Sequence, residues 1–144
     1  MKVLIATEGS PCSQAAVRSV AERPWPEGSE FRVLTVIERP PIYGTVMATD
    51  HIADDIRCAS ERIAIDAAST LQEFGRNASY TIPQSAADEE IINEAKEWGA
   101  NLILVGTHSR HGFSHLLLGS VARNVSLNAP CSVEIVRALE HSTT

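Results

Sequence analysis

The residues best suited to chemistry lie in one segment, 106–120. It contains three of the five histidines, an arginine, three glycines and several hydroxyl groups, and it ends where a helix is expected to begin, near Gly119. The first turn of a helix has free backbone N–H groups and a partial positive charge, and Ser120 adds a hydroxyl donor. Gly106 and Gly119 have no side chain to keep a phosphate oxygen away from the backbone. The segment therefore predicts a phosphate-binding site.

The elements around this segment alternate between strands and helices along the chain. Apolar runs at 3–6 and 102–105 are typical of strands that are covered on both faces in a parallel sheet. Further strands are expected at 31–37, 80–82 and 133–136. Such alternation predicts right-handed crossovers and helices on both faces of one sheet. The expected fold is therefore α/β, a single open parallel five-stranded sheet of the Rossmann-like type.

Helix boundaries are marked by residues that cap or stop a helix. Ser10 is expected as an N-cap with Pro11 as the first helical residue, and Ser85 with Asp88 resembles a capping box before another helix. A long helix is expected at 51–74, because apolar residues recur there every three or four positions. The stripe expected to face the core consists of Ile52, Ile56, Ala59, Ile63, Ala67 and Leu71. The residues expected to end helices are Pro24, Gly75, Gly99 and Pro130.

The position of the segment 106–120 within the predicted fold also favours a ligand site. In open sheets of this kind, a ligand binds beyond the carboxyl ends of the strands, where the winding direction of the chain reverses. The loops after the strands at 3–6, 31–37 and 102–105 are therefore expected to contribute. The chain as a whole is acidic, so the basic cluster in the third loop indicates a local site for a small anion.

Composition is typical of an ordinary globular protein. The 144 residues suffice for one domain, which we expect to span 1–144, and 44% hydrophobic with 21% charged residues is close to common usage. A net charge of −6 opposes binding to polymeric nucleic acid or to an anionic membrane. Cys12, Cys58 and Cys131 show no metal-binding or disulfide spacing, and the sequence opens directly with a strand-like run. We therefore expect a cytoplasmic protein.

Two stretches of the chain resemble a known family. Gly106 and Ser109, followed after nine residues by Gly119 and Ser120, resemble the carboxyl-terminal signature of the universal stress protein family, whose ATP-binding members carry G-x-x-G-x9-G-[S/T]. The opening V-L-I-A-T-E-G-S is similar to the family's first strand and its V-D-G-S turn, and N-A-P-C-S-V follows later as in the family. The resemblance covers essentially the whole chain. It implies a fold like that of the adenine nucleotide alpha hydrolases.

The resemblance also implies a ligand, which is ATP or a related adenine nucleotide, with or without Mg²⁺. The residues that it places on the base and ribose side are Ala6, Thr7, Glu8 and Val36. Those that it places along the ribose and phosphate path are Val105, Gly106, His108 and Ser109. The phosphates would be held by Gly119, Ser120 and Val121. The implied role is a regulatory domain in the stress response.

The sequence departs from the family's pattern at two positions. Ser109 stands where the binding signature has its second glycine, so a side chain occupies space near the phosphate path. Glu8 replaces the usual aspartate and is one methylene longer. Some members of the family have lost ATP binding together with the motif. A dimeric stress protein that binds no nucleotide and acts through protein partners therefore stays open as the alternative.

The last expected strand, at 133–136, indicates self-association. A short apolar strand at the edge of a sheet has unpaired backbone groups that can pair with a second copy of the same chain. The resemblance implies a homodimer formed there, and a closed two-fold contact would cover the edge.

Enzymatic chemistry is less well supported by the residues. Ser109 lacks the glycines two residues to either side that a nucleophile elbow needs, since Thr107 and His111 occupy those positions. The lysine-bearing P-loop is absent, so ATP hydrolysis is expected to be slow at most. His108, His111 and His115 have no cysteine or carboxylate nearby to complete a metal site. We therefore assign no catalytic residue and no metal ligand, and a small hydrolase or phosphotransfer enzyme is the third alternative.

Overall fold

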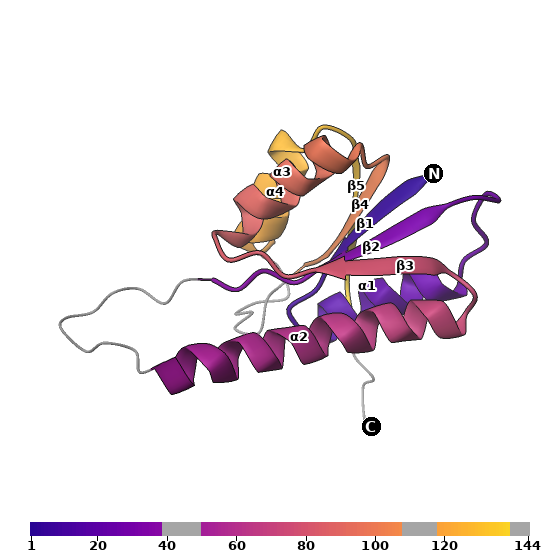
Figure 1. Ribbon diagram of the computed structural model, residues 1–144. Helices are drawn as coiled ribbons and strands as arrows, with labels where there is room; N and C mark the ends of the chain where they lie inside the picture. The colour runs from indigo at the N-terminus through magenta and orange to yellow at the C-terminus, as the bar shows by residue number, and fades with distance from the viewer. Residues whose placement is uncertain (39–49, 108–117, 139–144) are drawn as a thin grey trace, which may run out of the picture.

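The chain folds around one parallel sheet, as a computed structural model that describes residues 1–38, 50–107 and 118–138 shows (Figure 1). The strands are β1 (Lys2–Ala6), β2 (Glu30–Leu34), β3 (Asn77–Thr81), β4 (Leu102–Gly106) and β5 (Ser132–Val136). The helices are α1 (Pro11–Glu22), α2 (Asp50–Glu73), α3 (Ala87–Trp98) and α4 (Ser120–Asn128). The five strands are ordered β3-β2-β1-β4-β5 and all neighbours are parallel. The predicted fold class is confirmed.

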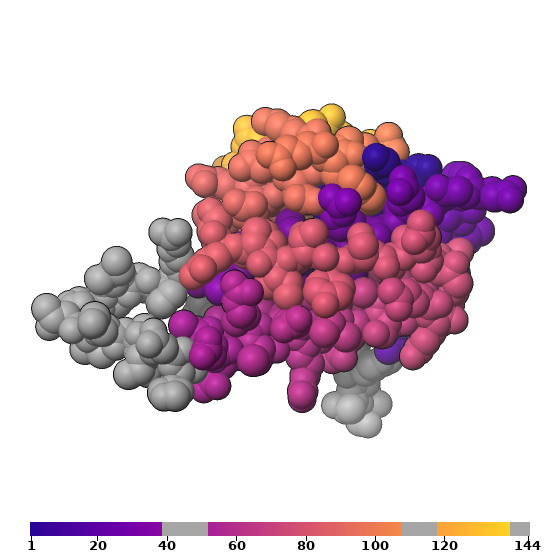
Figure 2. All heavy atoms as spheres, viewed as in Figure 1, coloured from indigo at the N-terminus to yellow at the C-terminus, as the bar shows by residue number. Residues whose placement is uncertain are grey.

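Two apolar cores lie on opposite faces of this sheet. On one face, strand residues such as Val3 and Ile5 pack with α1 and α2, and on the other face Leu4 and Ile103 pack with α3 and α4. In the space-filling view, the α3 side chains lie above and the α2 side chains below (Figure 2). Successive residues of a strand point to opposite faces, so a strand covered on both faces needs an unbroken apolar run. The runs in β1 and β4 are explained in this way.

Several predicted helix ends are confirmed. Ser10 is the N-cap of α1, where its hydroxyl accepts a hydrogen bond from the Ser13 backbone N–H at 3.2 Å, and Pro11 is the first helical residue. Gly99 follows α3 with a positive φ of 77°, and Gly75 follows α2 with φ of 78°. A glycine adopts this left-handed conformation without the steric cost that other residues meet.

The predicted capping box of α3 is wrong. Its N-cap is Ala86, which makes no side-chain capping bond. Ser85 instead donates its backbone N–H to the carbonyl of Ile37 at 3.1 Å, which holds it in the extended connection before the helix. The Asp88 carboxylate accepts hydrogen bonds from the Glu89 N–H at 2.9 Å and from the Asn124 amide at 2.7 Å. Asp88 therefore caps locally and also joins α3 to α4.

The second strand is shorter than predicted. The ladder of β2 ends at Leu34, and beyond it only an isolated parallel bridge joins Ile37 to Gln84. Pro83 lies between the end of β3 and this bridge and has no backbone N–H to donate to a ladder. The Ile37 N–H donates to the Pro83 carbonyl at 2.8 Å, so the chains stay adjacent without a continuous strand.

Helix α2 packs against the sheet over only part of its length. Its buried residues begin at Ala64, whereas Ile52 is 51% and Ile56 is 37% exposed, so the amino-terminal part of the predicted inner stripe is not in the core. A helix of 24 residues is about 36 Å long, and a five-residue strand spans about 17 Å. The amino end of α2 therefore extends past the carboxyl ends of the strands (Figure 1).

Candidate functional site

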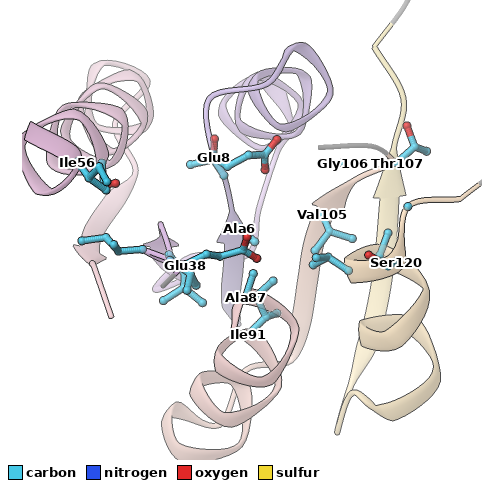
Figure 3. Close-up of a pocket in the computed structure, with 18 residues that line it drawn as sticks. Ala6, Glu8, Glu38, Ile56, Ala87, Ile91, Val105, Gly106, Thr107 and Ser120 are labelled. Atoms are coloured by element: carbon cyan, nitrogen blue, oxygen red, sulfur yellow. The ribbon is translucent and has the colours of Figure 1, made fainter. Parts of the chain in front are cut away.

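A cavity of about 380 Å³ opens at the carboxyl ends of β1, β2 and β4 (Figure 3). The chain adds β2 and β3 on one side of β1 and then returns to place β4 on the other, so the winding direction reverses at this point. The predicted site residues that line the cavity are Ala6, Thr7, Glu8, Val36, Val105, Gly106, Gly119, Ser120 and Val121. His108 and Ser109 lie outside the described residues, as do Arg110, His111 and His115. The structure thus brings together the residues that follow β1 and β2, the end of β4 and the start of α4.

The amino end of α4 forms one side of the cavity. Its N-cap is Gly119, which has no side chain to cap the helix, and its first turn contains no acidic residue. The backbone N–H groups at the start of a helix have no partner within the helix and carry its partial positive charge. Ser120, Val121 and Ala122, the first three residues of α4, all line the cavity. This side can therefore receive an anionic group.

Main-chain hydrogen bonds hold the amino end of α4 in place. The Gly119 N–H donates to the Thr107 carbonyl at 2.8 Å, and the Thr107 N–H donates to the Val136 carbonyl at 3.0 Å. Gly119 has φ of −61° and ψ of 152°, an extended conformation that any residue can adopt. The start of α4 is therefore attached through Thr107 to β5, and it is positioned by the sheet.

The opposite side of the cavity carries mainly apolar side chains. Val36 and Ile37 follow β2, Ala87 and Ile91 come from α3, and Ile56 comes from α2. In Figure 3, Ile56 lies across the cavity from Val105 and Ser120. The sequence analysis assigned Ile56 to the core-facing stripe of its helix. The spacing of such residues is that of any amphipathic helix, so no local signal distinguishes a cavity wall from a core contact.

Two carboxylates line the cavity from the ends of neighbouring strands. Glu8 follows β1 and Glu38 follows β2, and they are the charged lining residues among those that the structure describes. Oε1 of Glu8 is buried and has no hydrogen-bond partner among the residues that the structure describes. A buried acceptor without a donor costs about 1–3 kcal/mol. Glu8 is therefore suited to accept a hydrogen bond from a ligand.

The turn between β1 and α1 is held by a small hydroxyl network. Oγ1 of Thr7 donates to Oγ of Ser13 at 2.9 Å and accepts from the Gly9 N–H at 3.2 Å. Thr7 is buried, and Gly9 has φ of 86°, a conformation suited to glycine. The hydroxyl of Thr7 is thus engaged with α1, and it fixes the loop that presents Glu8.

Gly106 is needed for packing as well as for access. A Cβ atom at this position would lie 2.8 Å from Cβ of Cys12 and 2.9 Å from main-chain atoms of Cys12 and Ser13. The side-chain direction of Gly106 is therefore filled by α1. The sequence analysis expected Gly106 to leave room for a phosphate and did not anticipate its close packing against α1.

The described residues contain neither a metal-binding group of side chains nor a membrane-spanning helix. Within 1–38, 50–107 and 118–138, no group of three or more His, Cys, Asp or Glu side chains could hold a metal ion. Among the helices of these same ranges, none is long and apolar enough to cross a membrane.

The model of the universal stress protein family matches residues 1–137. Universal stress protein YxiE of Bacillus subtilis is 30% identical over 145 residues, which cover 94% of this chain and 98% of that protein. Among solved structures, hypothetical protein MJ0577 aligns with a TM-score of 0.83 at 23% identity and covers 94% of both chains.

Two similar structures contain nucleotides. A universal stress protein in complex with cAMP has a TM-score of 0.71 at 22% identity and covers 96% of this chain and 98% of its own. An Arabidopsis thaliana protein of the same family with AMP bound has a TM-score of 0.70 at 17% identity and covers 100% of this chain and 95% of its own. These likenesses extend along nearly the whole chain and support the fold.

Proposed function

Since this chain belongs to the universal stress protein family, we propose that its cavity binds ATP or a related adenine nucleotide as a regulatory ligand in the stress response. One observation carries the proposal. The uncapped amino end of α4 and an apolar wall made by Val36, Ile37 and Ile91 lie on opposite sides of the same cavity. The first suits phosphate and the second suits a purine base, so one nucleotide would satisfy both.

The proposed contacts follow from this arrangement. Ser120 and Val121 would donate backbone N–H groups to phosphate oxygens, with Gly119 at the start of the helix. Val36 would contact adenine, and Ala6 and Glu8 would lie along the base and ribose. The buried oxygen of Glu8 would accept a hydrogen bond from the amino group of adenine or from a ribose hydroxyl. The remaining proposed contacts of the ribose and phosphate path are Val105, Gly106, His108 and Ser109.

Mg²⁺ would accompany the phosphates. This cation is usually held by one or two carboxylates together with phosphate oxygens and water. The described residues that line the cavity supply only the carboxylates of Glu8 and Glu38. Because the proposed orientation places Glu8 at the base or ribose end, phosphate oxygens and water would be the main ligands of a bound Mg²⁺ ion, which would neutralise charge on the phosphate chain.

The test begins with the purified protein. Denaturation should release a nucleotide that chromatography identifies, and calorimetry on protein freed of it should show binding of AMP, cAMP or ATP with Mg²⁺. GTP serves as the comparison for base selectivity. If no nucleotide is released and none of these ligands produces heat or a thermal shift at millimolar concentration, the proposal is wrong.

A stress protein that binds no nucleotide is the second candidate function. The observation that favours it is Ser109 at the position where the binding signature of the family has a glycine. Such a protein would act through protein partners. The same binding experiment separates the two candidates, and Ser109→Gly would restore nucleotide binding if this side chain is the obstacle.

We also propose that the protein forms a homodimer through β5. The two edges of the sheet differ. On the β3 edge, the Gln72 amide already donates to the Ala78 carbonyl at 3.0 Å. On β5, the half-buried apolar residues Val133 and Ile135 lie on a strand that pairs only with β4 in the described structure. Pairing with a second copy about a two-fold axis would satisfy this edge.

A further inference from the structure

The amino-terminal half of α2 lacks the packing that the rest of the helix has. Every residue from 52 to 59 is exposed, whereas Ala64, Ala67, Ala68 and Leu71 are buried. Helical turns with few tertiary contacts are among the least stable parts of a protein, since isolated short helices are marginal in water. These turns therefore need a further contact to be held firmly.

One apolar side chain of this half is turned toward the ligand cavity. Ile56 lines the cavity together with Ser60, which lies one turn later on the same face of α2. Ile52 lies one turn earlier on this face and does not line the cavity, whereas the neighbouring positions carry Asp54, Asp55 and Arg57. Figure 3 shows Ile56 beyond Glu8 and Glu38 on the side away from α4. Ile56 is therefore an apolar group at the base side of the proposed site.

We infer that Ile56 is a contact residue of the ligand site, and that it packs against the purine base from α2. The inference rests on the proposed function. It adds Ile56 and helix α2, which lie outside the motifs that carry the family resemblance. The base supplies an apolar surface that α2 lacks at this point, so binding removes part of Ile56 from water. The ligand is thereby coupled to the first turns of α2, which gain order when the cavity is filled.

One substitution at Ile56 separates a ligand contact from a merely structural role, because it should lower ligand affinity without weakening the helix. Alanine is a better helix former than isoleucine, so Ile56→Ala should not weaken α2 as a helix. A loss of ligand affinity in this variant would therefore come from the lost contact. Ile52→Ala is the matched control, because it makes the same change one turn away on the same exposed face.

Calorimetry with AMP and adenosine tests the contact. Ile56→Ala should weaken both ligands by the same factor, about five- to tenfold, because the lost apolar contact is to the base that they share. Ile52→Ala should stay within about twofold of the unaltered protein. Hydrogen exchange on the unaltered protein should show slower exchange of the amides at 52–60 when AMP or adenosine is added.

The outcomes distinguish this inference from the proposed function. If the unaltered protein binds AMP but Ile56→Ala binds it equally well, or both variants lose affinity equally, the inference is overturned and the proposed function stands. Unchanged exchange at 52–60 on AMP binding also overturns it. If the unaltered protein binds neither AMP nor adenosine, the inference is overturned, and the proposed function is overturned with it if cAMP and ATP with Mg²⁺ do not bind either.

Discussion

Ser120 and Glu8 line the same cavity and have opposite electrostatic surroundings. Ser120 is the first residue of α4, where the helix carries a partial positive charge, whereas Glu8 brings a carboxylate with a buried, unpartnered oxygen. A phosphate near Glu8 would be repelled, and a phosphate near Ser120 would be attracted. These two residues therefore specify the orientation of the proposed nucleotide, with its phosphates at α4 and its base or ribose at Glu8.

A carboxylate at the start of α4 should compete with the phosphate. We expect Ser120→Asp to lower the affinity for AMP at least tenfold and to leave the affinity for adenosine nearly unchanged. An acidic residue in the first turn also interacts favourably with the helix dipole, so the free energy of unfolding should stay equal or rise by about 0.3–1 kcal/mol. Calorimetry and urea unfolding measure the two effects. Ser120→Asn is the uncharged control, and equal AMP affinity in all three proteins would place the phosphate elsewhere.

At the scale of elements, the site depends on how closely α1 packs against β4. Gly106 ends β4, and the space that its side chain would take is occupied by Cys12 and by the backbone of α1. Oγ1 of Thr107, the next residue, lies 3.3 Å from Sγ of Cys12. The Thr107 carbonyl accepts the N–H of Gly119. A displacement of α1 would therefore shift the end of β4, and with it the start of α4.

Adding a methyl group at Gly106 should force α1 away from the sheet. We expect Gly106→Ala to lower the free energy of unfolding by about 1–3 kcal/mol, because overpacking displaces backbone. Urea unfolding, monitored by circular dichroism, measures this free energy. Cys12→Ala should not restore stability in the double variant, since alanine keeps Cβ and the two main-chain contacts at 2.9 Å remain. If Gly106→Ala has the same free energy of unfolding as the unaltered protein, α1 can move away from β4 without a loss of stability.

At the scale of the whole molecule, the two edges of the sheet are protected differently. The β3 edge carries the Gln72 hydrogen bond to Ala78, and Tyr80 on this strand is 40% exposed. On β5, Glu134 forms an ion pair with Arg23 at the end of α1, which holds this strand against the rest of the molecule. Among the described residues, no side chain is hydrogen-bonded to the backbone of the β5 edge, so this strand is suited to pair with a second copy.

A lysine on β5 should separate the proposed dimer. We expect the unaltered protein to sediment as a dimer and Val133→Lys to shift it toward the monomer, because a charged edge residue opposes strand pairing. Tyr80→Lys on β3 is the matched control and should leave the dimer intact. Analytical ultracentrifugation measures the assembly, and circular dichroism checks the fold. A monomeric unaltered protein, or a dimeric Val133→Lys variant, would contradict the β5 interface.

Much of the fold could be predicted because its signals are local. The apolar runs of β1 and β4, the Ser10 cap with Pro11, and the glycine ends at Gly75 and Gly99 each depend on neighbours within about one helical turn or one strand. The start of α4, where the phosphates are proposed to bind, was predictable for the same reason, since a helix start is a local feature. The Ser85 capping box failed because a contact with Ile37, distant in the sequence, holds Ser85 outside the helix.

The sequence thus determined which segments become strands and helices and which loop could receive a phosphate. Only the tertiary structure decided what faces that loop. It places Ile56, on the part of α2 that extends past the sheet, across the cavity, and it leaves Oε1 of Glu8 buried without a donor among the described residues. The order of the strands and the difference in length between helix and strand bring these residues to one cavity. Residue spacing along a helix or strand records which face a side chain occupies, and it carries no information on what the rest of the chain places opposite.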